Sequence, residues 1–389
     1  MPEQIILIGA SVRAAAQSAV RGGFTPWCAD LFADRDLAAI APASRIRRYP
    51  AGLVAALVDA PAAAVIYTGA LENYPRLIEA IASRRPLWGN RGDVLRAIRN
   101  PLRVAEALRR AGLSSLKVTC LPDGLPRNGT WLCKPLRSGG GWRIAVWDEA
   151  AIDPHELPHG ASAGSSRRRG GCYFQQRVEG LNCSALFVAA AGESRLLGVT
   201  RQLVGVNWTG AGPFSYAGSI GPLSLPTQQL ATMRKVGDCL AAEFSLTGLF
   251  GVDAIINDAG VWPLEVNPRY PASAEVLERA RKFSAIQLHS EACTQNRLPS
   301  NDLSPPRCIA GKAILFGPRQ QLVPEQLIHW ADEQNATATW PAVADIPQIH
   351  GLLAPGAPVL TVLAEAADEQ QVEDLLRRRI ATAKSLLSS

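Results

Sequence analysis

The chain has 389 residues, of which 47% are hydrophobic and 19% are charged, and its formal net charge at pH 7 is +6. This composition is typical of a globular protein and excludes a disordered chain, while the length predicts two or three domains. No apolar segment approaches the roughly 20 residues that span a bilayer, and the first residues lack the basic region of a signal peptide. The sequence therefore predicts a cytoplasmic protein without a membrane partner.

Neither the cysteines nor the basic residues indicate a metal site or a nucleic-acid partner. Eight cysteines occur singly, without a CxxC pair, and the five histidines show no ligand spacing with them. We therefore expect reduced thiols rather than a structural zinc site. The excess of arginine is spread along the chain without an aromatic and basic patch, so no nucleic-acid partner is expected.

Residues 1–95 alternate between apolar strands and helices. The strands are expected in IILIGA, TPWCADLF and AAVIYTG, and the helices in RAAAQSAVRGG, GLVAALVDA and ENYPRLIEAIASRR. This order predicts a small parallel sheet covered by helices. Its first turn, Gly9-Ala10-Ser11, lacks the GxGxxG spacing that binds a dinucleotide, so a structural or substrate-binding domain is the better interpretation.

Residues 96–180 begin with a helix at 100–113 and continue with strands and Gly-rich turns. The segment WLCKPLRSGGGWRIAVW predicts a hairpin, and 151–171, which includes the run Arg167–Arg169, predicts a polar mobile loop. CYFQQRVEG is expected to be a strand that ends in a kink at Gly180.

The second half of the chain predicts more strands than helices. We expect helices at about 227–245, at 273–293 and at 369–387, a hairpin at 249–269, and a loop rich in glycine and aromatic residues at 207–222. Short strands are expected in KAILFGP, ATATWP and APVLTVLA after residue 307.

Two segments could contact a nucleotide. Lys134 ends a strand and is followed by the turn Ser138-Gly139-Gly140-Gly141, which offers a cation and bare amide groups to phosphate. The strand edge at 174–180 could present backbone groups to an adenine ring. Gly-rich hairpins and strand edges are also common without ligands, so neither segment is decisive alone.

The hairpin at 249–269 carries the strongest pattern. Glu265, Asn267 and Arg269 are two residues apart and therefore share one face of a strand. Asp253 on the first strand can pair with Glu265, and two facing carboxylates repel one another unless a cation lies between them. Hard oxygen ligands of this kind suit Mg²⁺ that bridges phosphates, and Arg269 could balance a developing anion. The alternative is an exposed polar ladder, although the apolar neighbours Leu264 and Val266 indicate a buried opposite face.

In this order, the three segments resemble the ATP-grasp superfamily, which includes biotin carboxylase, D-alanine–D-alanine ligase and the purine-biosynthesis carboxylases. The resemblance covers roughly residues 1–300 and implies an α/β and α+β fold: a parallel-sheet pre-ATP-grasp domain and two lobes that clasp ATP. It implies phosphate contacts from Lys134, Ser138 and the Gly139–Gly141 amides, and catalytic roles for Lys134 and Arg269. The hinge against adenine would be formed by Gln175, Gln176 and Val178, and the Mg²⁺ ligands would be Asp253, Glu265 and Asn267.

Three positions depart from the family pattern. Asn182 stands where an acid often holds the ribose, and Pro101 stands where an earlier lysine is found, with Arg99 and Arg103 nearby as substitutes. Gly251 replaces an arginine of the D-alanine ligases. The role of that arginine would therefore fall to Arg269 or Arg201.

The resemblance implies four parts and an ATP-dependent ligase. The parts are a pre-ATP-grasp domain at 1–95, a small lobe at 96–180, a large lobe at 181–300 and a β-rich lobe at 301–389 of the biotin-carboxylase kind. We expect a carboxylate–amine ligase that uses ATP and Mg²⁺ on small-molecule substrates, similar to tyramine–glutamate ligases of one-carbon coenzyme synthesis. Relatives of this branch are often homodimers, but the sequence leaves the oligomeric state open. The alternatives are a carboxylase and an ATP-binding module without turnover.

Overall fold

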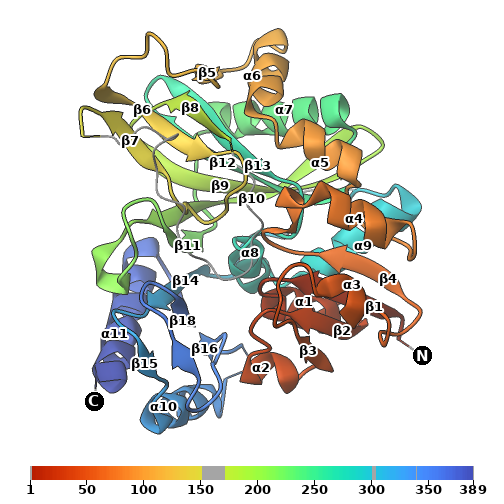
Figure 1. The fold of residues 1–389 in the computed structure, drawn as a ribbon, viewed down its shortest axis with the longest axis vertical. Helices are drawn as coiled ribbons and strands as arrows, with labels where there is room; N and C mark the ends of the chain where they lie inside the picture. The colour runs from red at the N-terminus through yellow and green to blue at the C-terminus, as the bar shows by residue number, and fades with distance from the viewer. Residues whose placement is uncertain (1, 151–170, 300–303, 339, 389) are drawn as a thin grey trace.

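The computed structural model describes residues 2–150, 171–299, 304–338 and 340–388. Most of the predicted loop at 151–171, with the run Arg167–Arg169, lies outside the described residues. Figure 1 shows three regions: the N-terminal domain, a lobe above it that contains β5 to β13, and a C-terminal region beside it. Among the described residues, no helix is long and apolar enough to cross a membrane.

The N-terminal domain is built on a parallel four-stranded sheet with the order β3-β2-β1-β4. Its strands are β1 (Gln4–Gly9), β2 (Thr25–Asp30), β3 (Ala43–Arg45) and β4 (Ala64–Tyr67). Its helical segments are α1 (Arg13–Arg21), α2 (Arg35–Ala38), α3 (Leu53–Ala56), η1 (Leu71–Asn73) and α4 (Pro75–Ala82). The predicted parallel sheet is confirmed.

Both faces of this sheet are buried, which explains its nearly continuous apolar strands. On β1, Ile5 and Leu7 pack toward α1 and α9, whereas Ile6 and Ile8 pack against Leu53 and the other helices of the domain. Adjacent side chains of a strand point to opposite faces, so one apolar run supplies two cores.

The small lobe follows helices α5 (Gly92–Ile98) and α6 (Pro101–Arg110). Its four-stranded sheet has the order β5-β8-β6-β7. The strands are β5 (Val118–Thr119), β6 (Asn128–Pro135), β7 (Ala145–Asp148) and β8 (Cys172–Gln176). The antiparallel pairing of β6 with β7 confirms the predicted hairpin. Trp147 and Phe174 form its small core, with ring centroids 4.9 Å apart.

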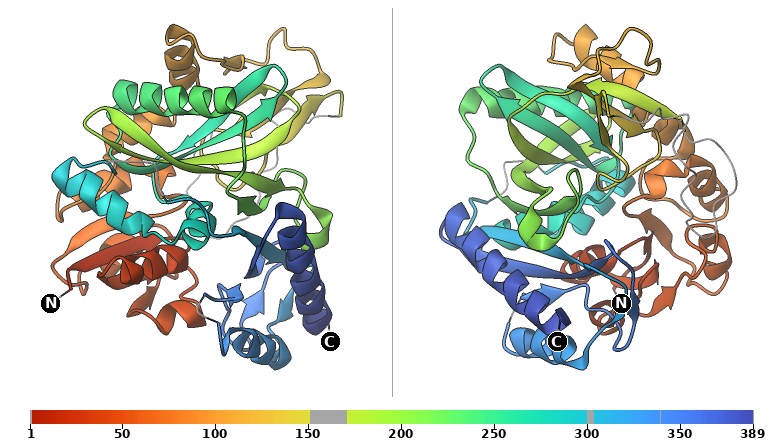
Figure 2. Two further views of the ribbon diagram at one scale, coloured as in Figure 1. Left: turned by 180° about the vertical axis from the view of Figure 1, so that it is seen from behind. Right: turned by 60° about the vertical axis from the view of Figure 1, so that its left-hand side comes forward.

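An eight-stranded sheet with the order β13-β12-β9-β10-β11-β14-β18-β16 joins the remaining parts. Its first half contains β9 (Leu181–Ala190), β10 (Glu193–Val204), β11 (Tyr216–Gly221), β12 (Gly248–Asn257) and β13 (Gly260–Asn267). The segment η2 (Asn207–Thr209) and helices α7 (Thr227–Phe244), α8 (Ala274–Arg281) and α9 (Ala285–Gln295) accompany these strands. Figure 2 shows α7 lying along the outer face of the sheet, while α8 and α9 lie on the side of the N-terminal domain.

The same sheet continues into the C-terminal region through β14 (Ile309–Phe316), β18 (Pro358–Ala366) and β16 (Val343–Ala344). A separate two-stranded sheet is formed by β15 (Gln321–Leu322) and β17 (Leu352–Leu353), and the helices here are α10 (Glu325–Asn335) and α11 (Glu369–Ser388). The sheet crosses the domain boundary that we predicted at residue 300, and the division into four parts stays a prediction.

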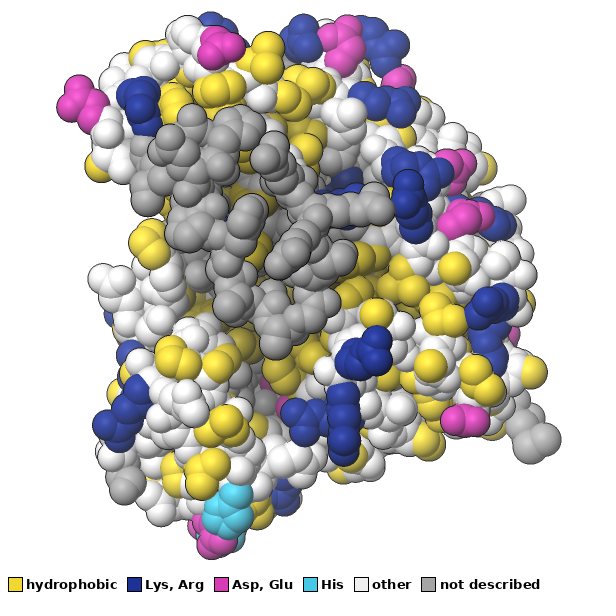
Figure 3. Space-filling view, in the orientation of Figure 1, with side chains coloured by type: hydrophobic (Ala, Val, Ile, Leu, Met, Phe, Trp, Pro, Cys, Tyr) yellow, Lys and Arg dark blue, Asp and Glu magenta, His cyan; other side chains and the backbone are white. Residues whose placement is uncertain are grey.

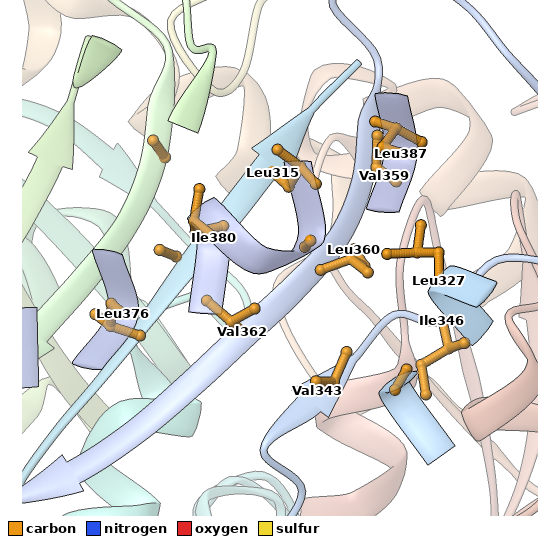
Figure 4. Packing of buried hydrophobic residues seen from close by; sticks show 14 of the residues in the cluster. Leu315, Leu327, Val343, Ile346, Val359, Leu360, Val362, Leu376, Ile380 and Leu387 are labelled. Atoms are coloured by element: carbon orange, nitrogen blue, oxygen red, sulfur yellow. The ribbon is translucent and has the colours of Figure 1, made fainter. Parts of the chain in front are cut away.

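The C-terminal core packs α10 and α11 against this half of the sheet. Figure 4 shows Leu376 and Ile380 of α11 near Val362 of β18, with Leu315 from β14 beside them. All four side chains are essentially buried, as expected for a helix that covers one sheet face with residues four apart.

Four secondary-structure predictions were wrong. The loop expected at 207–222 includes the strand β11, which pairs with β10 and β14 inside the large sheet. The helix expected in GLVAALVDA is only Leu53–Ala56. The helix expected at 273–293 is two helices, because Lys282 takes a left-handed conformation (φ 57°) that ends α8. The described part of ATATWP is not a strand; the strand nearby is Val343–Ala344. Helices α5 and α10 were not predicted.

Candidate active site

A cleft of about 1260 Å³ lies where the four parts of the chain meet. Its walls come from the carboxyl ends of β1 and β4, the small lobe, the hairpin β12–β13 and the C-terminal region. All of the predicted site residues line this cleft except Ser138, which lies in a smaller adjoining pocket with Arg99. Residues from 134 to 269 in the sequence therefore meet in one place, although their roles remain a prediction.

The hairpin β12–β13 has the predicted register. Asp253 lies directly opposite Glu265, and a bulge follows Asp253. The Asp253 carboxylate accepts hydrogen bonds from Gln202 Nε2 and Asn267 Nδ2, each at 3.0 Å. Both acids are half-buried and line the cleft, rather than lying on an exposed polar ladder.

The two carboxyl groups have opposite pKa shifts. Burial, followed by the charge of Glu265, raises the pKa of Asp253 to about 6. Burial also opposes ionisation of Glu265, but the charges of Arg99 and then Lys134 hold its pKa below the ordinary value. Glu265 is thus ionised near neutral pH, and Asp253, which is mostly ionised there, takes up a proton as the pH falls below about 6.

These residues could hold a divalent cation whose remaining ligands come from phosphate oxygens. Two facing carboxylates and one amide supply hard oxygen atoms, but the described residues hold no cluster of three or more His, Cys, Asp or Glu that would bind a metal alone. Mg²⁺ commonly takes one or two carboxylates and completes its shell with water and phosphate oxygens. In the structure, Asn267 Oδ1 accepts from Arg269 Nη2 at 3.1 Å, so the amide must turn before its oxygen could join such a shell.

Lys134 enters the cleft from β6 of the small lobe and is almost completely buried. Its Nζ donates to Gln175 Oε1 at 2.6 Å, and Gln175 Nε2 donates to the backbone oxygen of Leu264 at 3.1 Å. Burial lowers the pKa of Lys134, while Glu265 and Asp253 act in the opposite direction. Gln175 thus connects the two lobes through its side chain, whereas the resemblance implied a backbone role.

At the predicted hinge, the extended backbone that follows β8 has one side that does not pair with another strand. Gln176 N–H donates to Lys117 O at 2.9 Å, and Arg177 N–H donates to Thr130 O at 2.8 Å on the opposite side. Because peptide groups alternate in an extended strand, Gln176 C=O and Val178 N–H face the same side, and Val178 N–H has no hydrogen bond to another described residue. These two groups are the ones available to an adenine edge.

The Gly-rich turn is held by both neighbouring parts. Tyr216 N–H donates to Gly140 O at 3.1 Å, and Asn73 Nδ2 donates to Ser138 O at 3.1 Å. Gly141 has φ 82°, and a Cβ atom there would overlap the backbone oxygen of Phe214. Only glycine fits this position, because it combines a left-handed conformation with close backbone contact.

The structure distinguishes the two arginines proposed to replace the missing lysine. Arg99 is largely buried and pairs with Glu265, while its Nη2 donates to Asn73 Oδ1 and Ser138 O, each at 3.2 Å. Arg103 instead lies over the ring of Phe244, 5.9 Å from its centroid. Arg99 is therefore the residue that contacts both the candidate metal site and the Gly-rich turn.

Arg269 lies between the hairpin and the N-terminal domain. Its Nε and Nη2 donate to Glu72 Oε1 at 3.2 and 3.1 Å. Glu72 is 1% exposed, and its Oε2 is buried without a hydrogen bond among the described residues. Sequence reasoning missed Glu72; its position just after a parallel strand, where ligands often bind, was the available signal. Arg201, the second candidate, pairs with Glu369 and Glu373 of α11 and does not line the cleft.

A second group of charged residues, also missed, lines the far side of the cleft. Arg13 of α1 is buried, pairs with Glu275 of α8, and donates from Nε to Asp345 Oδ1 at 3.0 Å. Lys312 of β14 completes the cluster, with Nζ 3.1 Å from Glu275 Oε2. No single segment contains this pattern, since Arg13 is more than 260 residues from the other members and these lie more than 30 residues from one another.

Comparisons with a protein-family model and with solved structures also indicate an ATP-grasp fold. Residues 99–273 match the family model described as the ATP-grasp domain. An ADP complex of N5-carboxyaminoimidazole ribonucleotide synthetase aligns with a TM-score of 0.69 and 16% identity over 100% of this chain and 98% of that chain. A comparison with curated protein sequences gives no match.

Two further solved structures have the same fold. Biotin carboxylase from Campylobacter jejuni aligns with a TM-score of 0.67 and 14% identity over 96% of this chain and 89% of that chain. An L-amino acid ligase from Bacillus licheniformis aligns with a TM-score of 0.68 and 13% identity over 98% and 97% of the two chains. At these identities the likeness shows the fold alone.

Residues 99–273 therefore match the ATP-grasp domain, and the chain as a whole has the fold of N5-carboxyaminoimidazole ribonucleotide synthetase and biotin carboxylase. The predicted fold class is therefore confirmed.

Proposed function

We propose that the protein is an ATP-dependent carboxylate–amine ligase. The observation that carries this proposal is the meeting of Lys134, the Gly-rich turn and the pair Asp253–Glu265 in one cleft between two lobes. The L-amino acid ligase and the synthetase with the same fold support an activity of this kind.

The phosphate end of the site would be formed by the small lobe and the hairpin. Lys134 and the amide groups of Gly139–Gly141 would neutralise the phosphates, and Gln176 C=O and Val178 N–H would hold the adenine edge, with Asn182 toward the ribose. Asp253, Glu265 and Asn267 would hold Mg²⁺, which would supply charge neutralisation on the phosphate oxygens. A neighbouring structure in the same fold is a complex with MgADP.

The chemical step would transfer the terminal phosphoryl group to a substrate carboxylate. A carboxylate oxygen would attack the γ-phosphorus, the bond to the β-γ bridging oxygen would break, and ADP would leave. The amine would then attack the acylphosphate, and inorganic phosphate would leave as the amide forms. The guanidinium of Arg269 would stabilise the negative charge of both steps, and Glu72, which accepts from it, would hold it in place.

The metal assignment is tested with Glu265→Gln in the full chain. The amide keeps the shape of the side chain but removes a charge, so substrate-dependent ADP release should fall by about 100-fold or more, comparable with the loss of one main charge stabiliser. Glu265→Ala should also abolish ADP release, but it leaves Arg99 buried beside a void and is expected to fold less stably.

The control is Glu243→Gln, which removes an acid that pairs with Arg110 on the surface of α7 and does not line the cleft. This variant should release ADP at the wild-type rate. Full activity of Glu265→Gln would show that Glu265 does not hold the metal.

A carboxylase is the second candidate function. Two of the structures with the same fold are biotin carboxylase proteins, one of them in complex with bicarbonate. ADP formation that requires bicarbonate and no amine would favour this function. Tight ATP binding without phosphate release in a screen of acids and amines would instead indicate a module without turnover. A place in one-carbon coenzyme synthesis rests on the sequence resemblance alone.

The face of the molecule seen in Figure 3 is consistent with a small-molecule substrate. Basic and acidic side chains are interspersed over its described parts and do not form a basic stripe of the kind that binds nucleic acid. We propose small carboxylate and amine substrates; the homodimer stays a prediction.

A further inference from the structure

The far side of the cleft contains a carboxyl group without a partner. Asp34 follows β2 in the N-terminal domain, lines the cleft, and is 8% exposed. It occupies the position before α2 at which an aspartate commonly caps the helix, yet its side chain accepts no such hydrogen bond, nor one from any other described residue. Its carboxyl group is open to the cleft, so a ligand there could supply the missing hydrogen-bond donor or positive charge.

The neighbouring acids differ from Asp34, because their oxygen atoms are already used. Asp30 accepts hydrogen bonds from the backbone N–H groups of Val12, Phe32 and Ala33, at 2.7 to 2.8 Å. Asp36 accepts from the backbone N–H groups of residues 345 and 346, each at 2.9 Å.

Asp345 is likewise satisfied: it accepts from Arg13 at 3.0 Å and from Thr361 Oγ1 at 2.6 Å. Asp34 is thus the one member of this acidic group, within the described chain, that is left without a donor.

The charge around Asp34 is negative. Asp30, Asp36, Asp345 and Glu275 face only the buried cations Arg13 and Lys312, with Arg45 exposed at the rim of the cleft. Burial, followed by the charges of Asp345, Asp36 and Asp30, raises the pKa of Asp34 to about 8. A cation that entered beside Asp34 would gain from every one of these carboxylates.

The cleft that Asp34 lines also has apolar walls. Phe32, two residues before Asp34, and Val323, Leu352 and Leu353 line it, and Leu352 is 67% exposed. A polar group is also close, because Gln348 Nε2 donates to Ala33 O at 3.2 Å. One available carboxyl group in a cleft with apolar walls suits an organic cation with an apolar stem. A divalent metal ion would need several free oxygen ligands, and the other acids here have theirs engaged.

We propose that this end of the cleft is a subsite for a protonated amino group on an apolar stem, and that Asp34 is its specificity-determining anchor. The inference rests on the proposed function in one respect, namely that the cation belongs to the amine substrate. The subsite would recognise the substrate rather than react with it, since the phosphate-binding residues come from other lobes.

The test is calorimetric binding of three probes of equal length to the full chain: hexylamine, 1-hexanol and hexanoate. We expect hexylamine to bind at least 10-fold more tightly than the other two, and Asp34→Asn to weaken it by about 10-fold. Asp59→Asn, which removes an exposed acid of the same domain outside the cleft, should bind hexylamine as the wild type does.

Equal binding of the three probes to the wild type, or unchanged hexylamine binding to Asp34→Asn, would overturn the proposal. Asp34→Ser, checked for folding by circular dichroism, repeats the comparison should the asparagine variant fail to fold. Binding of Ca²⁺ that displaces hexylamine and requires Asp34 would also overturn it in favour of a metal site. None of these binding measurements needs ATP turnover. The test of the subsite can therefore fail or succeed independently of the test of ligase activity with Glu265→Gln.

Discussion

At the scale of single residues, the candidate site depends on charges that balance one another. Arg99 and Lys134 keep Glu265 ionised in a buried position, whereas Asp253 lacks a cation of its own and keeps a raised pKa of about 6. The positive charge of a bound metal ion would favour ionised Asp253, so metal binding is expected to weaken as the pH falls below about 6. The site thus combines one permanent carboxylate with one that responds to its ligand.

The unpaired carboxyl group of Asp34 predicts a pH-dependent effect on stability. Its pKa in the folded state, about 8, lies above the ordinary value of 3.8, so the folded state holds a proton that the unfolded state has released. The wild type therefore loses stability as the pH rises from about 4 to about 8, and Asp34→Asn lacks this loss. We expect the variant to be more stable than the wild type by about 1–3 kcal/mol at pH 8 and by much less at pH 4.

This prediction is checked by urea unfolding of both proteins at the two pH values. Asp59→Asn serves as the exposed reference. A stability difference between Asp34→Asn and the wild type that is the same at pH 4 and pH 8 would contradict the raised pKa.

At the scale of elements, the Gly-rich turn between β6 and β7 is positioned by segments that are distant in sequence. Gly140 accepts from Tyr216, which begins β11, and Ser138 accepts from Asn73 of the N-terminal domain. The turn can therefore present its amide groups only when the small lobe, the large lobe and the N-terminal domain are together. A substitution at Gly141 therefore tests whether the position of the turn matters for ATP binding.

Gly141→Ala is expected to impair ATP binding by displacing the turn. Its φ of 82° and its contact with Phe214 leave no room for a methyl group, so KM for ATP should rise by about 10-fold or more, measured by ADP release. Gly124→Ala is the matched control, because Gly124 has a similar φ of 76° but no atom within 4 Å of the added Cβ. Equal effects of the two substitutions would assign the loss to backbone strain alone.

At the scale of the whole molecule, the cleft is closed on its far side by contacts between the N-terminal domain and the C-terminal region. Arg35 N–H donates to Ile346 O at 2.9 Å, and Arg13 bridges α1, α8 and Asp345. These contacts join the first and last parts of the chain across one buried charge cluster.

Arg13→Met should destabilise the protein strongly. The substitution keeps much of the volume but leaves Glu275 and Asp345 buried with less positive charge, which commonly costs about 3–5 kcal/mol. Urea unfolding measures the change. Arg91→Met, which breaks an exposed pair with Glu79, should leave the unfolding midpoint unchanged. If the two variants unfolded alike, the buried cluster would not stabilise the assembly of the domains.

Much of the site was determined by the sequence because its key pairs are local. Asp253 and Glu265 are joined by a short hairpin, and strand periodicity places Glu265 and Asn267 on one face, so register alone brings the ligands together. Lys134 and its glycines share one hairpin for the same reason. In each case a few residues of backbone geometry fix the relative positions of the side chains.

Only the tertiary structure decided the contacts between distant segments. Arg99 rather than Arg103 reaches Glu265, Glu72 holds Arg269, and Asp34 is left unpaired beside Asp345, because domain packing brings these elements together. Periodicity describes the face of one helix or strand and carries no information about which distant face it meets. The end of the cleft that holds Lys134, Asp253 and Glu265 was therefore predictable from the sequence, whereas its opposite end was visible only in the folded chain.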